Sequence, residues 1–596
     1  MATITQGDFS IFGFFETREA GHWGEGGSNL NSTPTTLIHP TLTSTFAVPG
    51  VAATRTGGSY DFNHWDLAEA RQLADIRPDY HMVKNYKFLG RFDTFLIKDA
   101  DFFAFYRPWY DAEGTLKNKG RVEPFTDATN YTHRELQQQY FKNDLREYYA
   151  QLNFTDNFSA RIGKQQIIWS EADALSGTEV TNVVNSRWHG VYGAESAEDT
   201  RTNLRMIKFN YILPDFFKTA NNELEAFVIP GDFQGAGPIQ AQTDPRNPWV
   251  VPAAEGTGQT VANPFIASIN QAGQRMRVQM VPDFLSKPMA FIPLGPGGSG
   301  SFFDLPSTIV TNISHTPSNS LTHSEFGVRY SSLLPVGNGL QTSLIYLYEY
   351  RDAEAGVSCN CSASQANLGP GGIAIGRGLF LFPGVFLHGR PRPGVPKAGT
   401  FEILTTTNFR RNHFFGVTGT YYDKDLTDIV YRYDVLYQPD HAVTTTNVAH
   451  NPGGEAWTER ARFILAGDRP TYIPWISKQH TFLTAQYVNT WEPDRPSGAG
   501  PVGTSGKERE ITNFAFVSAV NWILNGQLTT GNVVLWDIDN NAGAFTTTNV
   551  YRYSRNVLFG VNAQWFLGRS GRYTDAFLLS RQQRFNELEF TFTYEI

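Results

Sequence analysis

The sequence predicts an all-β fold, and three observations support this prediction. Apolar side chains recur at every second position over many short segments, which is the spacing of one face of a β-strand. Aromatic residues make up 14% of the chain, with 45 Phe and 26 Tyr. Gly (54) and Pro (32) are scattered along the whole length, as many turns between strands require.

The C-terminal segment gives the clearest alternation. From Leu588 to Ile596 every second residue is apolar, and the residues between them are Glu or Thr. The same pattern recurs at 147–154, 206–211, 325–331, 429–437 and 557–565. Further strands are predicted at 7–17, 81–96, 99–110, 158–168, 223–229, 339–350, 399–409, 413–422, 477–491, 511–524 and 527–538.

These segments are typical of an antiparallel β-barrel of the bacterial outer membrane. A spanning strand needs only about 9–11 residues, with apolar side chains toward lipid and polar or small ones toward the lumen. Trp491, Trp522 and Trp565 lie near predicted strand ends, as an interfacial aromatic girdle requires. Single-chain bacterial barrels have an even number of strands. We therefore predict one transmembrane barrel over 1–596 with about 16 strands, and 14 or 18 as alternatives.

Composition and motifs exclude several other classes. The net charge of −8 provides no positive field for a nucleic acid. There is no apolar run of about 18 residues that would form a membrane-spanning helix. Cys359 and Cys361 are too few for a zinc site, and no nucleophile elbow or His-Glu-x-x-His motif is present. We therefore expect no enzyme activity, cofactor or metal.

The predicted connections fall into two lengths. Short ones are expected at 155–157, 335–339, 410–412 and 525–526. Long ones are expected at 18–79, 111–144, 169–204, 231–322, 351–398, 438–476, 492–508 and 566–584. Loops of such length in a compact fold are usually functional. We expect 169–204 and 231–322 to fold into the lumen or to cap its mouth.

Charged residues in and beside the predicted strands are candidates for lining the pore. Where a strand ends at Trp169, Glu171 and Asp173 are expected to pair with lumen arginines such as Arg161 and hold that segment inside the barrel. The segment would act as a charged constriction, as a structural anchor, or as both. The complete set of candidates is Arg161, Gln165, Glu171, Asp173, Lys208, Glu325, Arg329, Arg432, Asp434 and Glu589.

Two runs of sequence resemble a known family. The run from Arg161 to Asp173 ends a strand in Gly-Lys-Gln and continues with Trp-Ser-Glu and an Asp, and a second run covers 467–473. Both are similar to a proteobacterial outer-membrane family catalogued as domain of unknown function thirteen-oh-two. The chain departs from that pattern at Lys164, at Ser170 and at 182–186, which lacks the usual Pro. The resemblance implies a barrel that exports or takes up hydrophobic molecules beside periplasmic carrier or RND-type proteins.

The predicted function is an outer-membrane channel or transporter. It would pass a small solute or a hydrophobic, lipid-like molecule, and its other contact would be outer-membrane lipid. The alternative is a structural or docking barrel that sheathes or anchors a partner protein complex. A sheath needs a wide lumen with few inward loops, so the content of the lumen separates the two hypotheses.

Overall fold

The computed structural model describes most strands of the chain and fewer of its connections. The described residues are 3–6, 8–23, 35–36, 51–54, 66–112, 141–172, 181–182, 201–232, 275–282, 307–315, 319–350, 356–359, 400–408, 411–444, 455–493, 511–539, 541–567 and 586–596. Asp173, Cys361 and most of the predicted inward segments 169–204 and 231–322 lie outside this set. Cys359 is described only as part of a strand backbone.

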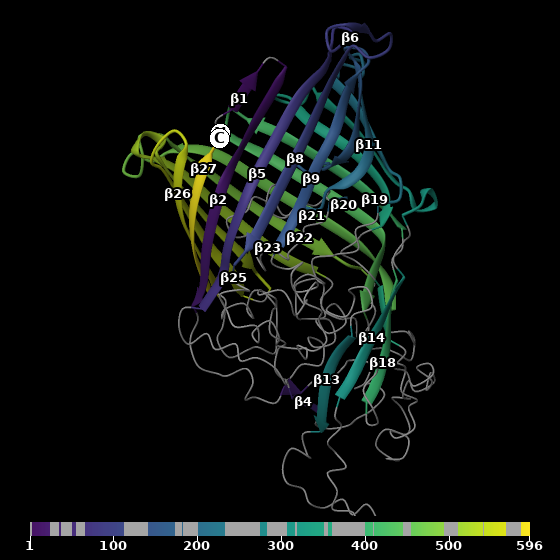
Figure 1. Cartoon of the computed structure of the whole chain (residues 1–596), viewed down its shortest axis with the longest axis vertical. Coiled ribbons are helices and arrows are strands. Elements are labelled where there is room, and N and C mark those ends of the chain that lie inside the picture. The colour runs from purple at the N-terminus through teal and green to yellow at the C-terminus, as the bar shows by residue number, and fades with distance from the viewer. Residues whose placement is uncertain are drawn as a thin grey trace, which may run out of the picture.

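The fold is a closed barrel of 18 antiparallel strands (Figure 1). Each strand pairs with the next one along the chain, and the last pairs with the first. In order around the barrel they are β2 (Phe9–Trp23), β5 (Asp66–Lys84), β8 (Asp99–Asp111), β9 (Phe141–Asn153), β10 (Phe158–Gln165), β11 (Leu204–Ile212), β12 (Ala220–Ile229), β15 (Glu325–Leu334), β16 (Leu340–Tyr350), β19 (Arg411–Asp423), β20 (Ile429–Thr444), β21 (Glu455–Tyr472), β22 (His480–Trp491), β23 (Ile511–Ile523), β24 (Leu528–Asp537), β25 (Ala542–Arg552), β26 (Val557–Leu567) and β27 (Asn586–Glu595).

The seam of the barrel lies between β27 and β2. Their ladder runs from Phe14 opposite Glu595 to Trp23 opposite Asn586. Beyond the end of β27, the same edge of β2 pairs with the short strand β1 (Thr3–Gln6). A small hairpin of β6 (Lys87–Phe88) and β7 (Phe92–Asp93) extends the connection between β5 and β8. The whole edge of β2 that faces the seam is therefore paired.

The prediction of about 16 strands was low, because β21 and β25 were assigned to no strand and the strand at 399–409 lies outside the barrel. The ranges 18–79 and 438–476 were predicted as connections, but they contain much of β5 and all of β21. Both strands carry many charged residues, which is why their alternation was missed. The range 81–96 was also wrong, since β5 ends at Lys84.

A second sheet of six short strands is formed by segments from the long connections. Its order is β17 (Gly356–Cys359), β18 (Thr400–Asn408), β14 (Ser307–His315), β13 (Arg275–Pro282), β4 (Val51–Thr54) and β3 (Thr35–Thr36). The predicted strand at 399–409 is β18, which runs parallel to β14. The predicted short turn at 410–412 is wrong for the same reason, because Arg411 and Asn412 begin β19 rather than join two barrel strands.

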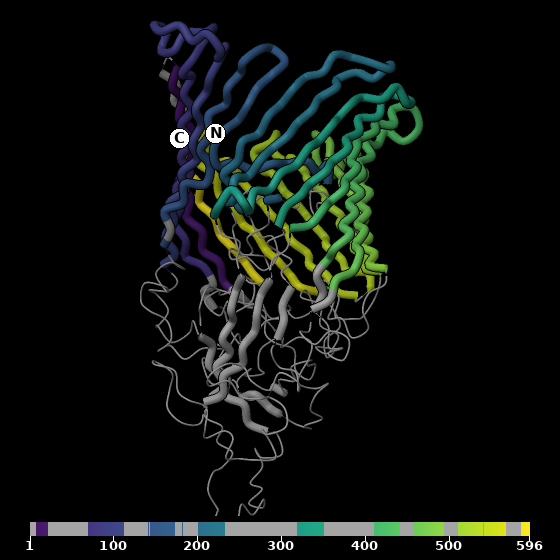
Figure 2. Tube along the Cα trace, turned by 90° about the vertical axis from the view of Figure 1, so that its right-hand side faces the viewer, coloured from purple at the N-terminus to yellow at the C-terminus, as the bar shows by residue number. Residues whose placement is uncertain are grey.

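Short connections gather at one rim of the barrel, together with both chain ends (Figure 2). They include 154–157, 335–339 and 524–527, which contain the predicted turns at 155–157, 335–339 and 525–526. Neighbouring turns are joined by an ion pair between Lys98 and Asp156, which raises the pKa of the Lys98 ammonium above its ordinary value. With one short exception at 538–541, each connection at the opposite rim has ten or more residues.

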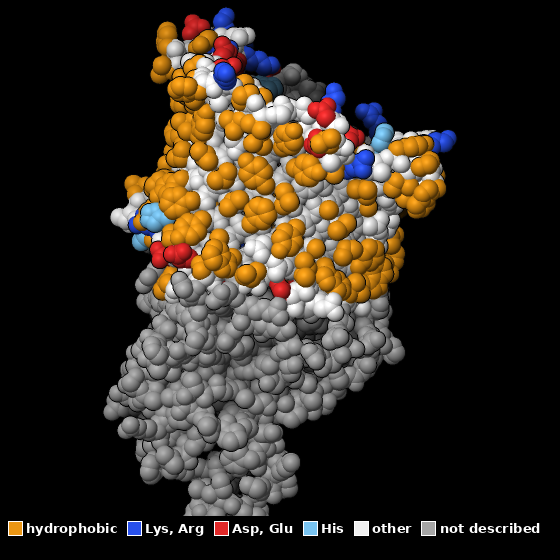
Figure 3. All heavy atoms as spheres, turned by 180° about the vertical axis from the view of Figure 1, so that it is seen from behind, with side chains coloured by type: hydrophobic (Ala, Val, Ile, Leu, Met, Phe, Trp, Pro, Cys, Tyr) orange, Lys and Arg blue, Asp and Glu red, His pale blue; other side chains and the backbone are white. Residues whose placement is uncertain are grey.

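Apolar side chains cover the outer wall of the barrel (Figure 3). Phe15, Leu344, Val517 and Phe590 are 49%, 57%, 51% and 47% exposed, and each points away from the lumen. Charged side chains lie mostly at the rim in the same view. A closed barrel whose neighbouring strands are paired all the way round, with an apolar exterior, is a structure that can span a membrane. This chain is therefore an outer-membrane β-barrel protein.

Candidate functional site in the lumen

The inner wall has an apolar half. Since the outward positions of each strand are the exposed apolar ones, the alternate positions face the lumen. We use the name apolar belt for the buried inward side chains of β11, β12, β16 and β19 to β22, with a half-buried Phe from β23. They are Leu204, Met206, Phe227, Ile229, Ile345, Leu347, Phe414, Leu436, Ile464, Val488 and Phe514. Four of them are completely inaccessible to solvent: Ile229, Leu347, Phe414 and Ile464.

A glycine lets the belt pass across β15. A Cβ atom at Gly327 would lie 2.3 Å from Cε1 of Phe227 and 2.5 Å from Cδ2 of Leu347. Any side chain there would push these two belt residues apart, because carbon atoms in contact lie about 3.5–4.0 Å from each other. The side chains of Phe227 in β12 and Leu347 in β16 therefore meet over Gly327 of β15.

A segment of the chain itself covers this belt. Residues 166–172, which we call the inner segment, follow β10 and run along the inner wall toward β20. Ile167 and Trp169 are 4% and 2% exposed and pack within the belt. The ring of Trp169 lies 5.2 Å from that of Phe227, and Ala172 packs against Ile464 and Val488. The inner segment thus lies on the apolar belt from β11 to β22.

Polar contacts hold the inner segment at its far end. The carboxylate of Asp434 in β20 accepts hydrogen bonds from Ser170 Oγ and, at 3.2 Å, from the backbone N–H of Glu171. Arg432 donates to the backbone oxygen of Glu171, and Thr420 Oγ1 donates to its carboxylate at 3.1 Å. Strands β11, β12, β15, β16 and β19 separate β10 from β20, so these contacts join distant parts of the wall.

The near end of the segment is held by amide groups. The backbone N–H of Ile167 donates to Asn182 Oδ1 at 2.7 Å, and Asn182 Nδ2 donates to the oxygen of Thr202 at 2.8 Å. Beside it, Thr181 Oγ1 donates to the buried carboxylate of Glu349 in β16 at 2.9 Å. The connection between β10 and β11 is therefore fastened to the wall at several of its described residues.

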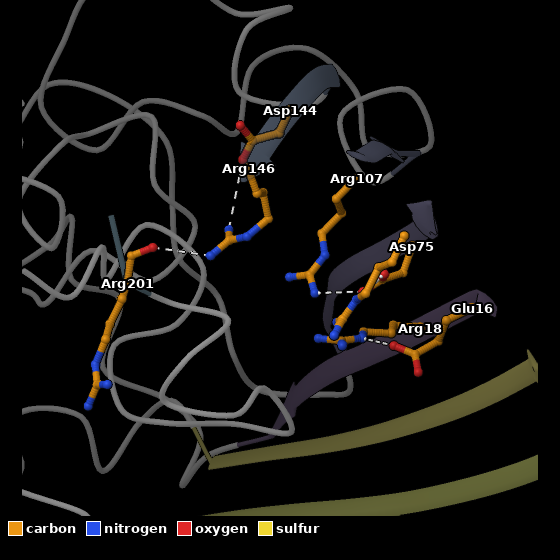
Figure 4. A network of polar contacts seen from close by, with 8 residues as sticks. Glu16, Arg18, Asp75, Arg107, Asp144, Arg146 and Arg201 are labelled. Carbon is orange, nitrogen blue, oxygen red and sulfur yellow. Dashed lines mark hydrogen bonds and ion pairs between the residues drawn. The ribbon is translucent and has the colours of Figure 1, made fainter. Parts of the chain in front are cut away.

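The inner wall of β2, β5, β8 and β9 carries a concentration of charged side chains. We use the name arginine cluster for the inward guanidinium groups of β2, β5, β8 and β9, which are Arg18, Arg71, Arg77, Arg107 and Arg146. Figure 4 shows several of them with their carboxylates. Asp75 is fully buried and binds Arg77 at 2.7 Å and Arg107 at 3.1 Å.

Aromatic rings support the arginine cluster. The guanidinium carbons of Arg77, Arg107 and Arg146 lie 4.2, 4.8 and 5.7 Å from the ring centre of Phe105. Arg146 also donates to the backbone oxygen of Arg201 at 3.1 Å (Figure 4). Stacking on a ring and pairing with a carboxylate both fix the direction of a guanidinium group. The cluster is therefore a set of oriented charges on one side of the lumen.

The predicted pore residues divide among several groups. Arg161 donates to Gln151 Oε1 at 2.9 Å and lies over Tyr149, so the arginine that Glu171 meets is Arg432 and not Arg161. Gln165 donates to the backbone oxygen of Arg161 at 3.2 Å. Arg432 forms an ion pair with Asp468 at 2.6 Å.

The remaining predicted residues lie elsewhere on the wall. Lys208 and Arg329 both pair with Glu225, at 2.5 and 3.4 Å. Glu325 accepts a hydrogen bond from the backbone of Tyr350 at 2.6 Å, and Glu589 accepts one from Asn562 at 2.7 Å. Asp173 is outside the described residues.

Sequence reasoning missed most of the arginine cluster. A signal for it was present in β5, where Glu69, Arg71, Asp75 and Arg77 all occupy positions of one strand face. Trp169 was noted only as part of a motif, because nothing local indicates what its ring packs against.

The part of the chain that the structure describes contains no group of three or more His, Cys, Asp or Glu residues that could hold a metal ion. No helix among those residues is long and apolar enough to cross a membrane.

Comparisons with known proteins give a family and a set of similar folds. Residues 28–578 match the model of a family described as protein of unknown function (DUF1302). No curated protein matches the chain. The outer membrane channel DcaP of Acinetobacter baumannii shares 9% identity over 100% of both chains, with a TM-score of 0.35. OccAB3 of the same organism shares 8% over 99% of both, with a TM-score of 0.39.

A third solved structure, a BenF-like porin from Pseudomonas fluorescens Pf-5, has 7% identity and a TM-score of 0.40, over 99% of this chain and 98% of its own.

Proposed function

Since the chain belongs to the family described as protein of unknown function (DUF1302), we propose its function from its own lumen: a porin-like channel that lets a small solute cross the bacterial outer membrane. The observation that carries this proposal is the divided inner wall. One half is lined by the oriented charges of the arginine cluster, and the other half is covered by the inner segment.

The size of the barrel supports an aqueous path. Barrels of 16–18 strands enclose a lumen wide enough for water, whereas barrels of eight strands are filled by side chains. In this chain the inner segment lies against β11 to β22. The space left for a solute would therefore run beside the charged half of the wall, where Arg107 and Arg146 alternate with Asp75 and Asp144. Paired charges of both signs favour a polar solute over a bare hydrocarbon.

The sheath hypothesis has less support. A barrel that encloses a partner protein needs an empty lumen, but here part of the chain itself is fastened inside by Asp434 and Glu349. A periplasmic carrier or RND-type protein remains a proposed partner from the family resemblance alone.

Conductance measurements test the proposal. The purified chain, inserted into planar lipid bilayers, should give discrete current steps in potassium chloride. Arg146→Ala removes a positive charge from the wall of the proposed path, so the reversal potential in a salt gradient should shift toward cation selectivity.

The matched control for this variant is Arg205→Ala. The side chain of Arg205 is 62% exposed and points outward from β11, so its removal should leave the reversal potential unchanged. Both variants should keep the heat-modifiable gel mobility of a folded barrel. A folded wild-type chain that inserts and carries no current would contradict the channel.

A further inference from the structure

The apolar belt has no evident use in a polar channel. A pore for polar solutes needs charged and hydrogen-bonding side chains along its wall, and β2 to β10 supply them. The belt instead places carbon and one thioether on the inner face of strands from β11 to β23, with Gly327 in β15, whereas other inward positions of these strands carry paired charges such as Lys208 with Glu225. The apolar surface of the belt would be costly to leave in contact with water.

Three side chains of the inner segment bury parts of the belt, and one of them, Trp169, fits imperfectly. Trp169 is 2% exposed, but its indole N–H has no hydrogen-bond partner among the described residues. A buried indole normally finds an acceptor, and leaving it without one is unfavourable. The ring of Trp169 is thus well matched to Phe227 in shape and poorly matched to its surroundings in polarity.

The polar contacts that fix the segment use other groups than the side chains that bury the belt. Ile167, Trp169 and Ala172 bury their side chains on the belt, whereas Ser170 and Glu171 supply the polar contacts to Asp434, Arg432 and Thr420. At the near end, Ile167 uses its backbone N–H, which donates to Asn182. If these contacts and the near-end hydrogen bond from Ile167 to Asn182 open, the segment can leave the wall, and the belt then faces the lumen. The wall beneath it belongs to the continuous barrel sheet and needs no rearrangement.

We propose that the apolar belt is a binding site for an apolar solute with a flat or ring-shaped body, which Ile167 and Trp169 occupy in this structure and vacate when the solute binds. Phe227 and Phe414 provide the faces for such a body, and Leu347 and Met206 provide its edges. A solute without an N–H would fill the place of the indole without leaving a buried donor unpaired. This site rests on the proposed channel function, since the solute reaches the belt through the lumen.

A disulfide lock tests the proposal. Ser170→Cys and Asp434→Cys are combined in a chain whose Cys359 and Cys361 are replaced by Ser, and the protein is reconstituted in liposomes. Oxidation ties the segment to β20, and reduction releases it. The probe is diphenylhexatriene, an apolar aromatic hydrocarbon without an N–H that fluoresces in apolar surroundings. Because the same liposomes are measured before and after reduction, partition of the probe into lipid cancels.

The reduced chain should bind the probe at least about tenfold more tightly than the oxidised chain. As a second variant, Trp169→Ala should also bind it about tenfold more tightly than wild type, because it empties part of the site. Its control is Trp491→Ala, an outward tryptophan that is 47% exposed, which should bind as wild type does. Equal binding by the oxidised and reduced chains, or no gain in Trp169→Ala, would overturn the site.

Bilayer conductance of the same preparations separates this inference from the channel. Current without any difference in probe binding removes the apolar site and keeps the channel. Probe binding that depends on the lock, without current, removes the channel and keeps a site for apolar solutes inside the barrel.

Discussion

Replacing Asp434 with Ala should free the inner segment while the barrel stays closed. Asp434 is fully buried, and it accepts one hydrogen bond from Ser170 Oγ and one from the Glu171 backbone. Hydrogen bonds to a charged group contribute about 1.5–3 kcal/mol each. The two together stabilise the attached position by about 3–6 kcal/mol, and the ladders of β20 involve only its backbone.

We expect Asp434→Ala to destabilise the attached position by an amount near the lower end of that range. Arg432 and Thr420 still hold Glu171 in the variant, and the apolar contacts of Trp169 remain. A loss of about 3 kcal/mol corresponds to an increase of about a hundredfold in the fraction of molecules whose segment is released. Asp434→Asn keeps one acceptor oxygen, so it should give a smaller increase, of about tenfold.

A cysteine at position 172 measures this fraction. The side chain of Ala172 is 6% exposed and packs against Ile464 and Val488. In Ala172→Cys, with both natural cysteines replaced by Ser, a water-soluble maleimide can reach the thiol only when the segment has left the wall. The rate of labelling in liposomes should rise about a hundredfold when Asp434→Ala is added.

The matched control is Asp111→Ala. Asp111 is a buried lumen carboxylate too, but it binds Arg71 and the backbone N–H of Ala70 on the charged half of the wall. Its removal should leave labelling of Ala172→Cys unchanged. If Asp434→Ala were labelled at the wild-type rate, the polar contacts of Asp434 would not be what holds the segment.

Two further predictions concern the stability of the barrel. Gly327→Val should lower the stability by about 1–3 kcal/mol, because the added carbons meet Phe227. The temperature at which the folded gel mobility is lost should therefore fall. Gly531→Ala, whose Cβ would have nothing nearer than 4.0 Å, is the control and should show no loss. Glu492→Gln should lower the free energy of unfolding in urea by about 3–5 kcal/mol, since the fully buried Glu492 pairs with Arg460 at 2.8 Å. Replacing both residues by apolar ones should recover most of that loss. An unchanged urea midpoint in the single variant would contradict the importance of the pair.

Much of the barrel could be predicted from the sequence because lipid imposes period two on the outer face of every strand. Segments such as Leu588–Ile596 and 557–565 carry that signal without interruption. The signal failed in β5 and β21, whose inner faces hold Glu69, Arg71 and Asp468. Arg71 pairs with Glu69 in the same strand and with Asp111 in β8, and Asp468 pairs with Arg432 in β20. Without the folded wall around them, such charged segments are typical of a loop.

The segment 399–409 shows a different limit of prediction from sequence. Its residues have high β-propensity, and they do form a strand, β18. Propensity cannot identify the partner, and here that partner is β14, from another connection of the chain. Pairing between distant segments is set by the folded arrangement and leaves no local trace.

The candidate site was predictable in its composition but not in its geometry. Asp434, Arg432 and Glu171 were all expected to face the lumen, and all three meet there. The sequence placed Glu171 beside Arg161, because the two are close in the chain, whereas the segment reaches across to β20. How far a connection extends inside a barrel depends on which part of the wall its apolar residues pack against. Here Trp169 packs on Phe227.

The seam between β2 and β27 has a consequence for biogenesis. Until β27 has paired with β2, the folding sheet has two open edges, and open edges are templates for misassociation. β1 pairs with one end of β2 and so covers part of one open edge. A truncation that removes β27 would leave the rest of that edge of β2 and the edge of β26 that β27 covers without a partner strand. Such a product should accumulate as aggregate in the periplasm and should never reach the bilayer.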